Sequence, residues 1–274
     1  MKKLLSIILL AVTSFTASAA PWSDTSVALR VGNTFSEPYN TKDVHKDILS
    51  LTHVSGYSLG SNFVTADFLI SDANDPAGAG SSNGAQEVYV VYRNTVDFNK
   101  YTGMKLNFGP FKGINLVSGF DLNTKTDAGY NSKKRMLVAG VGLPVAIPFG
   151  FAEVNLLSLW ESNAPFNTYS GVSTSRYAYA PHPMLNVVWG IPVTGDVVFS
   201  GFANFIAPKG KDEFGNDTAT ETNIDTQLMY KVTPNFLAGV QYQWWRNKFG
   251  NDANGPAGQG ANASTWMLRT EYHF

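Results

Sequence analysis

Hydrophobic and polar residues alternate with a period of two along most of this chain. This is the pattern of a β-strand with one apolar and one polar face. In the segment 264–274, Trp266 and Phe274 share the apolar face, whereas Arg269 and Glu271 share the polar face. A charged face opposite an aromatic face is typical of a transmembrane barrel, whose outside touches lipid and whose inside is polar.

The same alternation recurs at intervals and predicts about twelve strands. It is strong in 236–245 and 264–274 and weaker in 197–206 and 223–231. The predicted strands are 27–31, 47–57, 62–70, 87–93, 116–123, 137–143, 152–156, 185–191, 197–206, 223–231, 236–245 and 264–274.

The lengths of the links between these strands give an independent test. Bacterial barrels alternate short periplasmic turns with long external loops, whereas a soluble β-sandwich has no reason to sort its loops in this way. The short links are 57–61, 144–150, 192–196 and 233–235, and the long ones are 34–46, 72–85, 123–133, 161–183, 208–222 and 247–263. Only the link 97–113 breaks the order. The chain is therefore predicted to be all-β, a single closed antiparallel transmembrane β-barrel with both termini periplasmic.

The N-terminus predicts export. Lys2 and Lys3 precede an apolar run from Leu4 to Val12, and the small residues 17–19 follow as a cleavage site. The run is too short to span a bilayer as a helix. We expect residues 1–19 to be a signal peptide and residues 20–274 to form the barrel, in the outer membrane of a Gram-negative bacterium.

Composition narrows the choice further. The absence of cysteine excludes a disulfide framework, thiolate metal sites and a lipoprotein anchor. The net charge is −1 without a basic stripe, so nucleic acid is not an expected partner. The expected partners are the lipid bilayer, lipopolysaccharide and the barrel-assembly machinery. The terminal Phe274 fits the aromatic end that is characteristic of the last strand of such barrels.

Two motifs could indicate hydrolase chemistry. Residues 56–60 match a nucleophile elbow, but a plain strand follows where that chemistry needs a helix, so we interpret them as a tight glycine turn. His53 and Ser55 lie two apart and therefore on one strand face, where they could act as base and nucleophile. Outer-membrane phospholipases and lipid A deacylases use such a pair on the lipid-facing side. The chain lacks the Ser-Asn motif of those enzymes and a residue to orient the base, so we expect no enzyme and keep a lipid hydrolase as the alternative.

No metal or cofactor site is predicted. The four histidines lack metal-ligand spacing, and the acidic loop 212–217 lacks the spacing and terminal glutamate of an EF-hand. That loop, with Asp212, Glu213, Asn216 and Asp217, is interpreted as a solvated surface loop in which loose Ca²⁺ contact is left open. The glycine-rich runs 78–84 and 255–260 have no following helix to bind phosphate and are interpreted as flexible external loops.

Several stretches resemble the Tsx/OmpK family of outer-membrane nucleoside channels. The most specific is Asn-Phe-Gly-Pro-Phe-Lys at 107–112, after Lys-Tyr-Thr-Gly at 100–103. Thr-His-Val-Ser-Gly-Tyr at 52–57 is similar to the OmpK branch, and weaker matches spread over most of the mature chain. The resemblance implies a monomeric twelve-stranded barrel with a narrow pore for nucleosides, and external loops that can serve as phage receptors. It also accounts for the overlong link 97–113.

A nucleoside needs a flat apolar surface for its base and hydrogen-bonding groups for its sugar. Inward strand parity offers aromatic residues for stacking and charged or amide residues as polar partners. The predicted pore-lining residues are Phe63, Asp67, Tyr89, Arg93, Asp121, Gln241, Gln243, Trp245, Arg269 and Glu271. The alternative for each charged residue is a salt bridge that braces the wall. Trp245, Gln243, Arg269 and Glu271 are expected to form one patch on neighbouring strands. The predicted function is passive uptake of small polar solutes, nucleosides above all.

Overall fold

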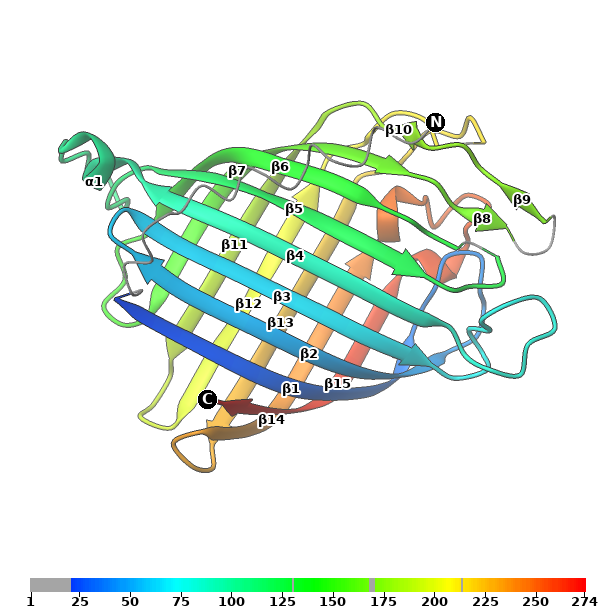
Figure 1. The fold of residues 1–274 in the computed structure, drawn as a ribbon, viewed down its shortest axis with the longest axis horizontal. Helices are drawn as coiled ribbons and strands as arrows, with labels where there is room; N and C mark the ends of the chain where they lie inside the picture. Colours follow the sequence, from blue (N-terminus) through cyan, green and yellow to red (C-terminus); the bar gives the residue numbers. More distant parts are fainter. Residues whose placement is uncertain (1–20, 130, 168–170, 213) are drawn as a thin grey trace, which may run out of the picture.

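The computed structural model describes residues 21–129, 131–167, 171–212 and 214–274, which form a closed β-barrel (Figure 1). The barrel wall is a thirteen-stranded antiparallel sheet, made of twelve long strands and the two-residue strand β10 (Tyr177–Ala178). Pairing of β15 with β1 closes the sheet. The long strands are β1 (Trp22–Phe35), β2 (Val44–Tyr57), β3 (Gly60–Ser71), β4 (Gln86–Asp97), β5 (Asn115–Lys125), β6 (Arg135–Pro144), β7 (Phe151–Asn163), β11 (His182–Pro192), β12 (Val197–Ile206), β13 (Glu221–Lys231), β14 (Phe236–Arg246) and β15 (Ala263–His273).

The strands confirm the predicted fold class and the predicted segments. Most strands are a few residues longer than the pattern indicated, because hydrogen bonding continues where the alternation ends. Residues 56–60 form a tight turn between β2 and β3, and β3 follows where a nucleophile elbow would need a helix. The predicted signal peptide, residues 1–19, lies outside the described residues.

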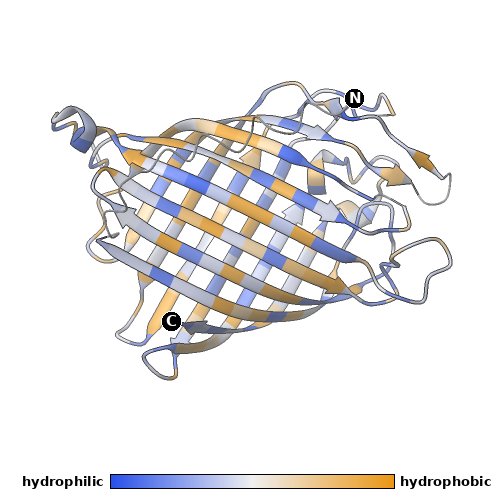
Figure 2. Ribbon diagram, viewed as in Figure 1, coloured by the Kyte–Doolittle hydropathy of each residue, from blue (hydrophilic) through white to orange (hydrophobic). Residues whose placement is uncertain are grey.

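Hydrophobic and hydrophilic residues alternate along the strands (Figure 2). This alternation separates an apolar outside from a largely polar inside. On β1, Leu29 and Val31 are exposed on the outer face, and Arg30 between them is buried inside. On β15, Leu268 pairs with Val31 and is 70% exposed, whereas Arg269 pairs with Arg30. An apolar face this exposed is stable only against lipid, because water would leave the whole band unburied.

The two ends of the barrel differ in how the strands are joined. β1 begins and β15 ends at the end with short links, where the Phe274 amide donates to the Thr25 carbonyl (2.9 Å). The link between β4 and β5 is the longest at this end and carries α1 (Phe98–Thr102), capped by the Asp97 carboxylate and ended by Gly103 at φ 74°. None of the described helices is long and apolar enough to cross a membrane. In bacterial barrels the short turns are periplasmic, so the end with short links is assigned to the periplasm.

The opposite, external end carries the long loops, and these hold short elements of their own. The loop between β7 and β11 contains the hairpin of β8 (Phe166–Asn167) and β9 (Val172–Ser173). The loop between β14 and β15 contains the 3₁₀ turns η1 (Lys248–Gly250) and η2 (Gln259–Ala261). The glycine-rich run 255–260 lies in this external loop, and its Gly260 is buried and packs against the backbone of Glu37 and Asn40.

One side of the interior is apolar and the other is charged. Inward residues of β5, β6, β7 and β11 form a buried apolar cluster, which Ile206 of β12 extends. The members are Val117, Met136, Val138, Leu157, Leu159 and Met184. Inward residues of β1, β3, β14 and β15 are instead dominated by arginine, carboxylate and amide groups. The lumen therefore offers an apolar surface and a hydrogen-bonding surface.

Candidate functional site: the barrel lumen

All ten residues predicted to line the pore occupy inward-facing positions. The strand registers show this: Arg269 lies opposite the buried Arg30, and Asp67 lies opposite the buried Ser50. The ten are Phe63, Asp67, Tyr89, Arg93, Asp121, Gln241, Gln243, Trp245, Arg269 and Glu271. Their role in binding a solute stays a prediction.

Arginines on opposite sides of the β1–β15 seam organise the charged wall. The Arg30 guanidinium donates to Ser50 Oγ (2.7 Å) and lies 2.6 Å from Asp67 Oδ2. The Arg269 guanidinium donates to Glu271 Oε2 (2.6 Å) and to Gln241 Oε1 (3.0 Å). Each arginine is thus paired with a carboxylate, which offsets the cost of burying its charge.

Asp225 on β13 joins this wall to the neighbouring strand. Its carboxylate accepts hydrogen bonds from Gln241 (2.5 Å) and Gln243 (3.3 Å). Gln241 in turn accepts from Arg269, so the network runs from β13 through β14 to β15. This continuous chain of donors and acceptors is held in place before a solute arrives, as a selective pore requires.

A second paired group lies on β4 and β5. The Arg93 guanidinium lies 2.5 Å from Asp121 Oδ1, and the Tyr89 hydroxyl donates to Asp121 Oδ2 (3.2 Å). Phe63 on β3 is in register with Arg93 and leaves 37% of its side chain exposed. An exposed inward ring beside a paired arginine can stack a planar solute.

The predicted single patch on β14 and β15 was wrong. Trp245 pairs with Ala263, whereas Arg269 pairs with Gly239, six residues before Trp245 in β14. At about 3.4 Å per residue, the two lie roughly 20 Å apart along the strand. Trp245 instead donates from its indole nitrogen to Glu221 Oε1 (2.8 Å) near the external end. Antiparallel pairing causes this, since residues late in β14 face residues early in β15.

The external mouth holds a buried group of charges, here called the outer charge cluster: Glu37, Lys46, Asp75, Lys125 and Lys248. The Glu37 carboxylate lies 2.5 Å from Lys46 Nζ, 3.2 Å from Lys125 Nζ and 3.0 Å from Lys248 Nζ. Asp75 lies 3.1 Å from Lys125. Glu37, Asp75 and Lys248 come from three different loops, so the cluster ties those loops to the wall.

The surroundings favour the ionised state of Glu37. Burial by itself would raise the pKa of its carboxyl, but Lys125, Lys248 and Lys46 outweigh burial and hold this pKa well below the usual value. Burial lowers the pKa of Lys248 and raises the pKa of Asp75. Both shifts favour the neutral form, so these two residues of the outer charge cluster lose their charge most readily. Glu37 is therefore the charge on which the cluster depends.

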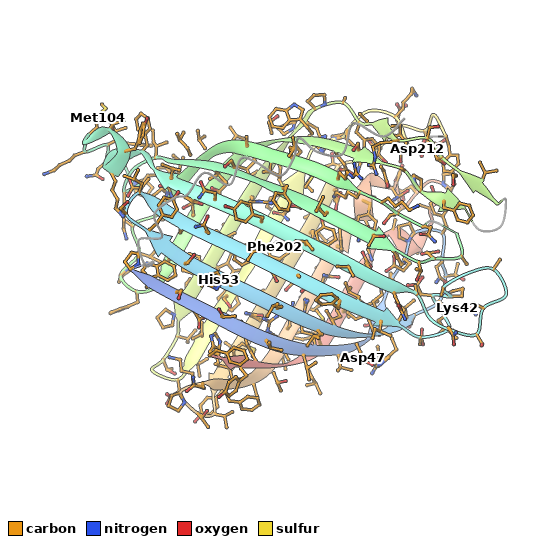
Figure 3. All side chains as sticks on the ribbon, in the orientation of Figure 1. Lys42, Asp47, His53, Met104, Phe202 and Asp212 are labelled. Atoms are coloured by element: carbon orange, nitrogen blue, oxygen red, sulfur yellow. The ribbon has the colours of Figure 1, made fainter. Side chains whose placement is uncertain are left out.

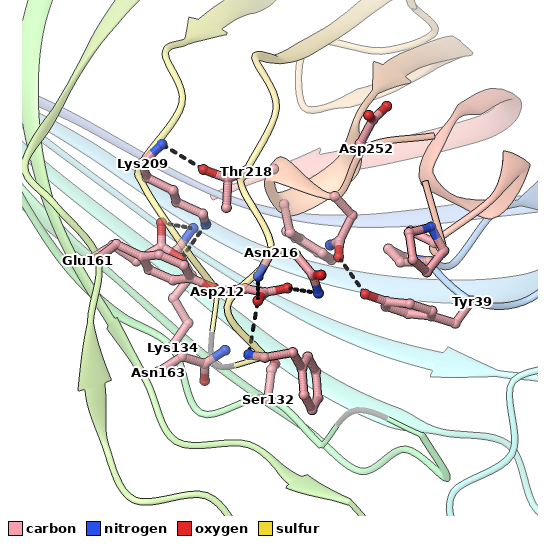
Figure 4. Close-up of a pocket in the computed structure, with 18 of the residues that line it drawn as sticks. Tyr39, Ser132, Lys134, Glu161, Asn163, Lys209, Asp212, Asn216, Thr218 and Asp252 are labelled. Carbon is pink, nitrogen blue, oxygen red and sulfur yellow. Dashed lines mark hydrogen bonds and ion pairs between the residues drawn. The ribbon is translucent and has the colours of Figure 1, made fainter. Parts of the chain in front are cut away.

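A pocket of about 90 Å³ opens beside this cluster among the external loops (Figure 4). Lys209 reaches into it from the loop after β12, donating to Glu161 Oε1 (2.8 Å) with its ammonium 4.1 Å from the Tyr179 ring centre. Lys134 lies 3.8 Å from the same carboxylate. The external loops thus line this pocket with paired charges.

The periplasmic mouth holds a cavity of about 550 Å³. It is lined by Trp22, Ser61, Thr95 and Asn115 and by the charged Asp97, Lys100 and Lys112. A Cβ on Gly56 would lie 2.2 Å from the Trp22 ring, so glycine is required for the ring to lie flat on the wall. Lys100 and Lys112 come from the link between β4 and β5, the longest link at this end.

His53 and Ser55 do not form a catalytic pair in the structure. They share the outer, lipid-facing parity of β2, as the alternative required (His53 is labelled in Figure 3). However, His53 Nδ1 is hydrogen-bonded to Thr25 Oγ1 (2.8 Å) on β1. No hydrogen bond joins His53 to Ser55, and no carboxylate contacts the imidazole, among the described residues. The arrangement lacks the oriented base that nucleophilic hydrolysis needs.

No group of acidic or histidine residues in the described part of the chain could hold a metal ion. In the loop 212–217, Asp212 accepts hydrogen bonds from the backbone of Phe214 and Asn216, and Asp217 pairs with Lys211 (3.0 Å). The carboxylates are used within the loop. Glu213, which the sequence placed in this group, lies outside the described residues.

Sequence reasoning missed the residues that hold the network together. Arg30 was the lone charge on the inner face of the predicted strand 27–31, and this isolation could have marked it. Asp225 lies in the weakly alternating segment 223–231 and carried no comparable signal. The outer charge cluster was missed because Glu37 and Lys248 lie in loops, where no periodicity assigns an orientation.

Comparison with known proteins rests on the fold. No protein-family model matches the sequence, and no curated protein matches it. The COG4313 outer membrane channel from Pseudomonas putida F1 has 13% identity and a TM-score of 0.53, over 92% of this chain and 95% of that one. The KdgM porin has 11% identity and a TM-score of 0.43, over 91% of this chain and 99% of that one. The translocator domain of the autotransporter NalP from Neisseria meningitidis has 9% identity and a TM-score of 0.46, over 92% of this chain and 88% of that one.

The class of the protein follows from these observations. It is a twelve-stranded outer-membrane β-barrel of a Gram-negative bacterium, with an apolar outer band and a polar lumen. At such low identities the similarity concerns the fold alone. Its resemblance to the Tsx/OmpK family remains a matter of the sequence motifs.

Proposed function

We propose that this barrel is an outer-membrane channel for the passive uptake of small polar solutes, and that nucleosides are its main solutes. The observation that carries the proposal is the charge-compensated lumen. Arg30, Arg93 and Arg269 each pair with a carboxylate within 2.6 Å. A wall of paired charges offers donors and acceptors without a strong net field, which suits a neutral solute with many hydroxyl groups.

Aromatic residues support the choice of nucleosides. Phe63 and Tyr89 face the lumen beside Arg93, and Trp245 faces it nearer the external mouth. Stacking of a base on a ring contributes roughly 1–3 kcal/mol, enough to concentrate a solute without trapping it. Tyr89 and Trp245 are already hydrogen-bonded to Asp121 and Glu221, so both rings are held in fixed positions.

Liposome swelling tests the proposal. Purified barrel is reconstituted into vesicles, and the entry rates of a nucleoside, a neutral sugar of similar size and a nucleoside monophosphate are compared. We expect the nucleoside to enter faster than the sugar, because only the nucleoside has a base to stack. The monophosphate should enter more slowly, since its charge is uncompensated in a wall of paired groups.

Trp245→Ala and Phe63→Ala should remove the advantage of the nucleoside over the sugar and leave entry of the sugar unchanged or faster. Trp160→Ala is the matched control, because Trp160 faces outward and is 45% exposed. Equal rates for the nucleoside and the sugar in the unmodified channel would contradict nucleoside selectivity. No swelling with any solute would contradict the channel itself.

A further inference from the structure

The link between β4 and β5 stands out from the other links at the periplasmic end. Residues 98–113, here called the β4–β5 protrusion, carry α1 and extend beyond the strand ends at the rim of the barrel (Figure 1). Its apolar side chains are exposed: 66% for Tyr101, 51% for Met104 and 45% for Phe108. A group of exposed apolar side chains like this marks a surface that contacts another molecule or the membrane.

The charge of the protrusion is one-sided. Lys100, Lys105 and Lys112 lie within it, and residues 98–113 contain no acidic residue, although the whole chain has a net charge of −1. All three lysines are exposed. Lys100 has an acidic neighbour only at the end of β4, with its Nζ 3.7 Å from Asp97 Oδ2. The surface thus combines uncompensated positive charge with aromatic rings.

Hydrogen bonds hold the protrusion in shape. The Asn99 amide donates to the carbonyls of Leu106 (3.1 Å) and Lys112 (3.3 Å). The Lys112 amide donates to the Pro144 carbonyl (2.9 Å), which ties the protrusion to the end of β6. The rings of Phe108 and Phe111 pack with their centres 5.5 Å apart. The lysines and rings are therefore presented by an ordered element, not by a loose tail.

The protrusion joins the lipid-facing surface directly. The next outward residue of β5 is the exposed Leu116, and it pairs with the exposed Val141 of β6. Figure 3 shows Met104 at the far periplasmic tip, beyond these strands. This rim is where the acyl chains of the inner leaflet give way to headgroups. Aromatic and lysine side chains are the residues that anchor proteins at that boundary.

We infer that the β4–β5 protrusion binds anionic phospholipid headgroups of the periplasmic leaflet. Lys100, Lys105 and Lys112 attract the phosphate groups, and Tyr101, Met104 and Phe108 insert among the upper acyl chains. The other short links at this end offer no comparable set of lysines. The inference is independent of which solute the channel carries.

The absence of native cysteine allows a direct test with the full-length barrel. Met104→Cys is labelled with an environment-sensitive fluorophore, and the barrel is reconstituted in vesicles of phosphatidylcholine alone or with phosphatidylglycerol. We expect a blue-shifted emission with phosphatidylglycerol, and quenching by a lipid-attached quencher that is roughly twofold or more stronger. Gly195→Cys, in the turn between β11 and β12, is the control label and should respond little.

Charge variants decide whether headgroups are recognised. With the label at 104, the triple change Lys100→Gln, Lys105→Gln and Lys112→Gln should abolish the response to phosphatidylglycerol. The matched control removes the same charge at the external end, through Lys42→Gln, Lys133→Gln and Lys211→Gln, and should keep the response. Emission that is equal in both lipids would overturn the inference, and so would a response that survives the triple change in the protrusion.

Discussion

The two mouths of this barrel are built in opposite ways. At the external mouth, Glu37 and Lys248 come from loops and meet Lys46 and Lys125 of the wall in contacts of 2.5–3.2 Å. At the periplasmic mouth, the links leave a cavity of about 550 Å³, lined by Trp22 and small polar residues and at its edge by Asp97, Lys100 and Lys112. Loop length explains the difference, because only long loops can reach back over the opening.

The comparison indicates where passage is controlled. The charged groups of the lumen wall are paired on neighbouring strands and leave the opposite wall apolar. The charges of the outer cluster instead connect separate loops across the mouth. A wall pair braces the barrel, whereas a pair that bridges loops can open when one partner is lost. Control of permeation is therefore expected at the external end.

Glu37→Gln should have the largest effect. The three lysines would lose their shared carboxylate, and breaking a buried ion pair costs about 3–5 kcal/mol. We expect the loops to separate and the single-channel conductance to rise several-fold. Asp217→Asn breaks the exposed pair with Lys211, which contributes at most about 1 kcal/mol, and should change nothing. Equal conductance in the Glu37 and Asp217 variants would show that the cluster does not restrict the mouth.

Acidity should act through the same carboxyl. The pKa of Glu37 is lowered in the folded protein, so the stability that its ion pairs give to the loops is complete above pH 4.5, the usual pKa of a glutamate. This stability is lost only as pH falls through the lower pKa of the folded state. Asp75, with its raised pKa, should titrate first, without releasing Lys46 or Lys248. Conductance recorded during acid titration should stay low at pH 4.5 and rise below it. This rise should be absent from Glu37→Gln, and a rise well above pH 4.5 would contradict the assignment.

Arg269→Ala should have a smaller effect on a different property. It leaves Glu271 and Gln241 without their shared donor, so the wall gains net negative charge at mid-barrel. We expect a shift toward cation selectivity in reversal-potential measurements, with conductance nearly unchanged because the outer charge cluster stays intact. Arg135→Ala is the control, since Arg135 is exposed at the start of β6. The same shift in both variants would place the selectivity outside the lumen.

Strand periodicity predicted the wall well and the mouths poorly, for a physical reason. Each wall residue faces either lipid or lumen, so its polarity reports its orientation, as with Leu268 and Arg269. Residues in loops have no such constraint. Glu37 meets Lys248 across 211 positions, a contact that only the closed barrel and its folded loops create. The predicted patch of Trp245 with Arg269 was wrong for a related reason, because parity fixes the face but not the height along the barrel.

Single-channel recording in a planar bilayer, with a nucleoside added in steps, tests most directly whether the charge-compensated lumen carries neutral polar solutes. We predict small, discrete conductance steps that the nucleoside reduces in a saturable manner, because a base stacked in the lumen excludes ions. The block should weaken in Trp245→Ala, while the ion conductance stays equal or rises. Steps that are indifferent to nucleoside at every concentration, or a membrane that shows no steps at all, would contradict this role.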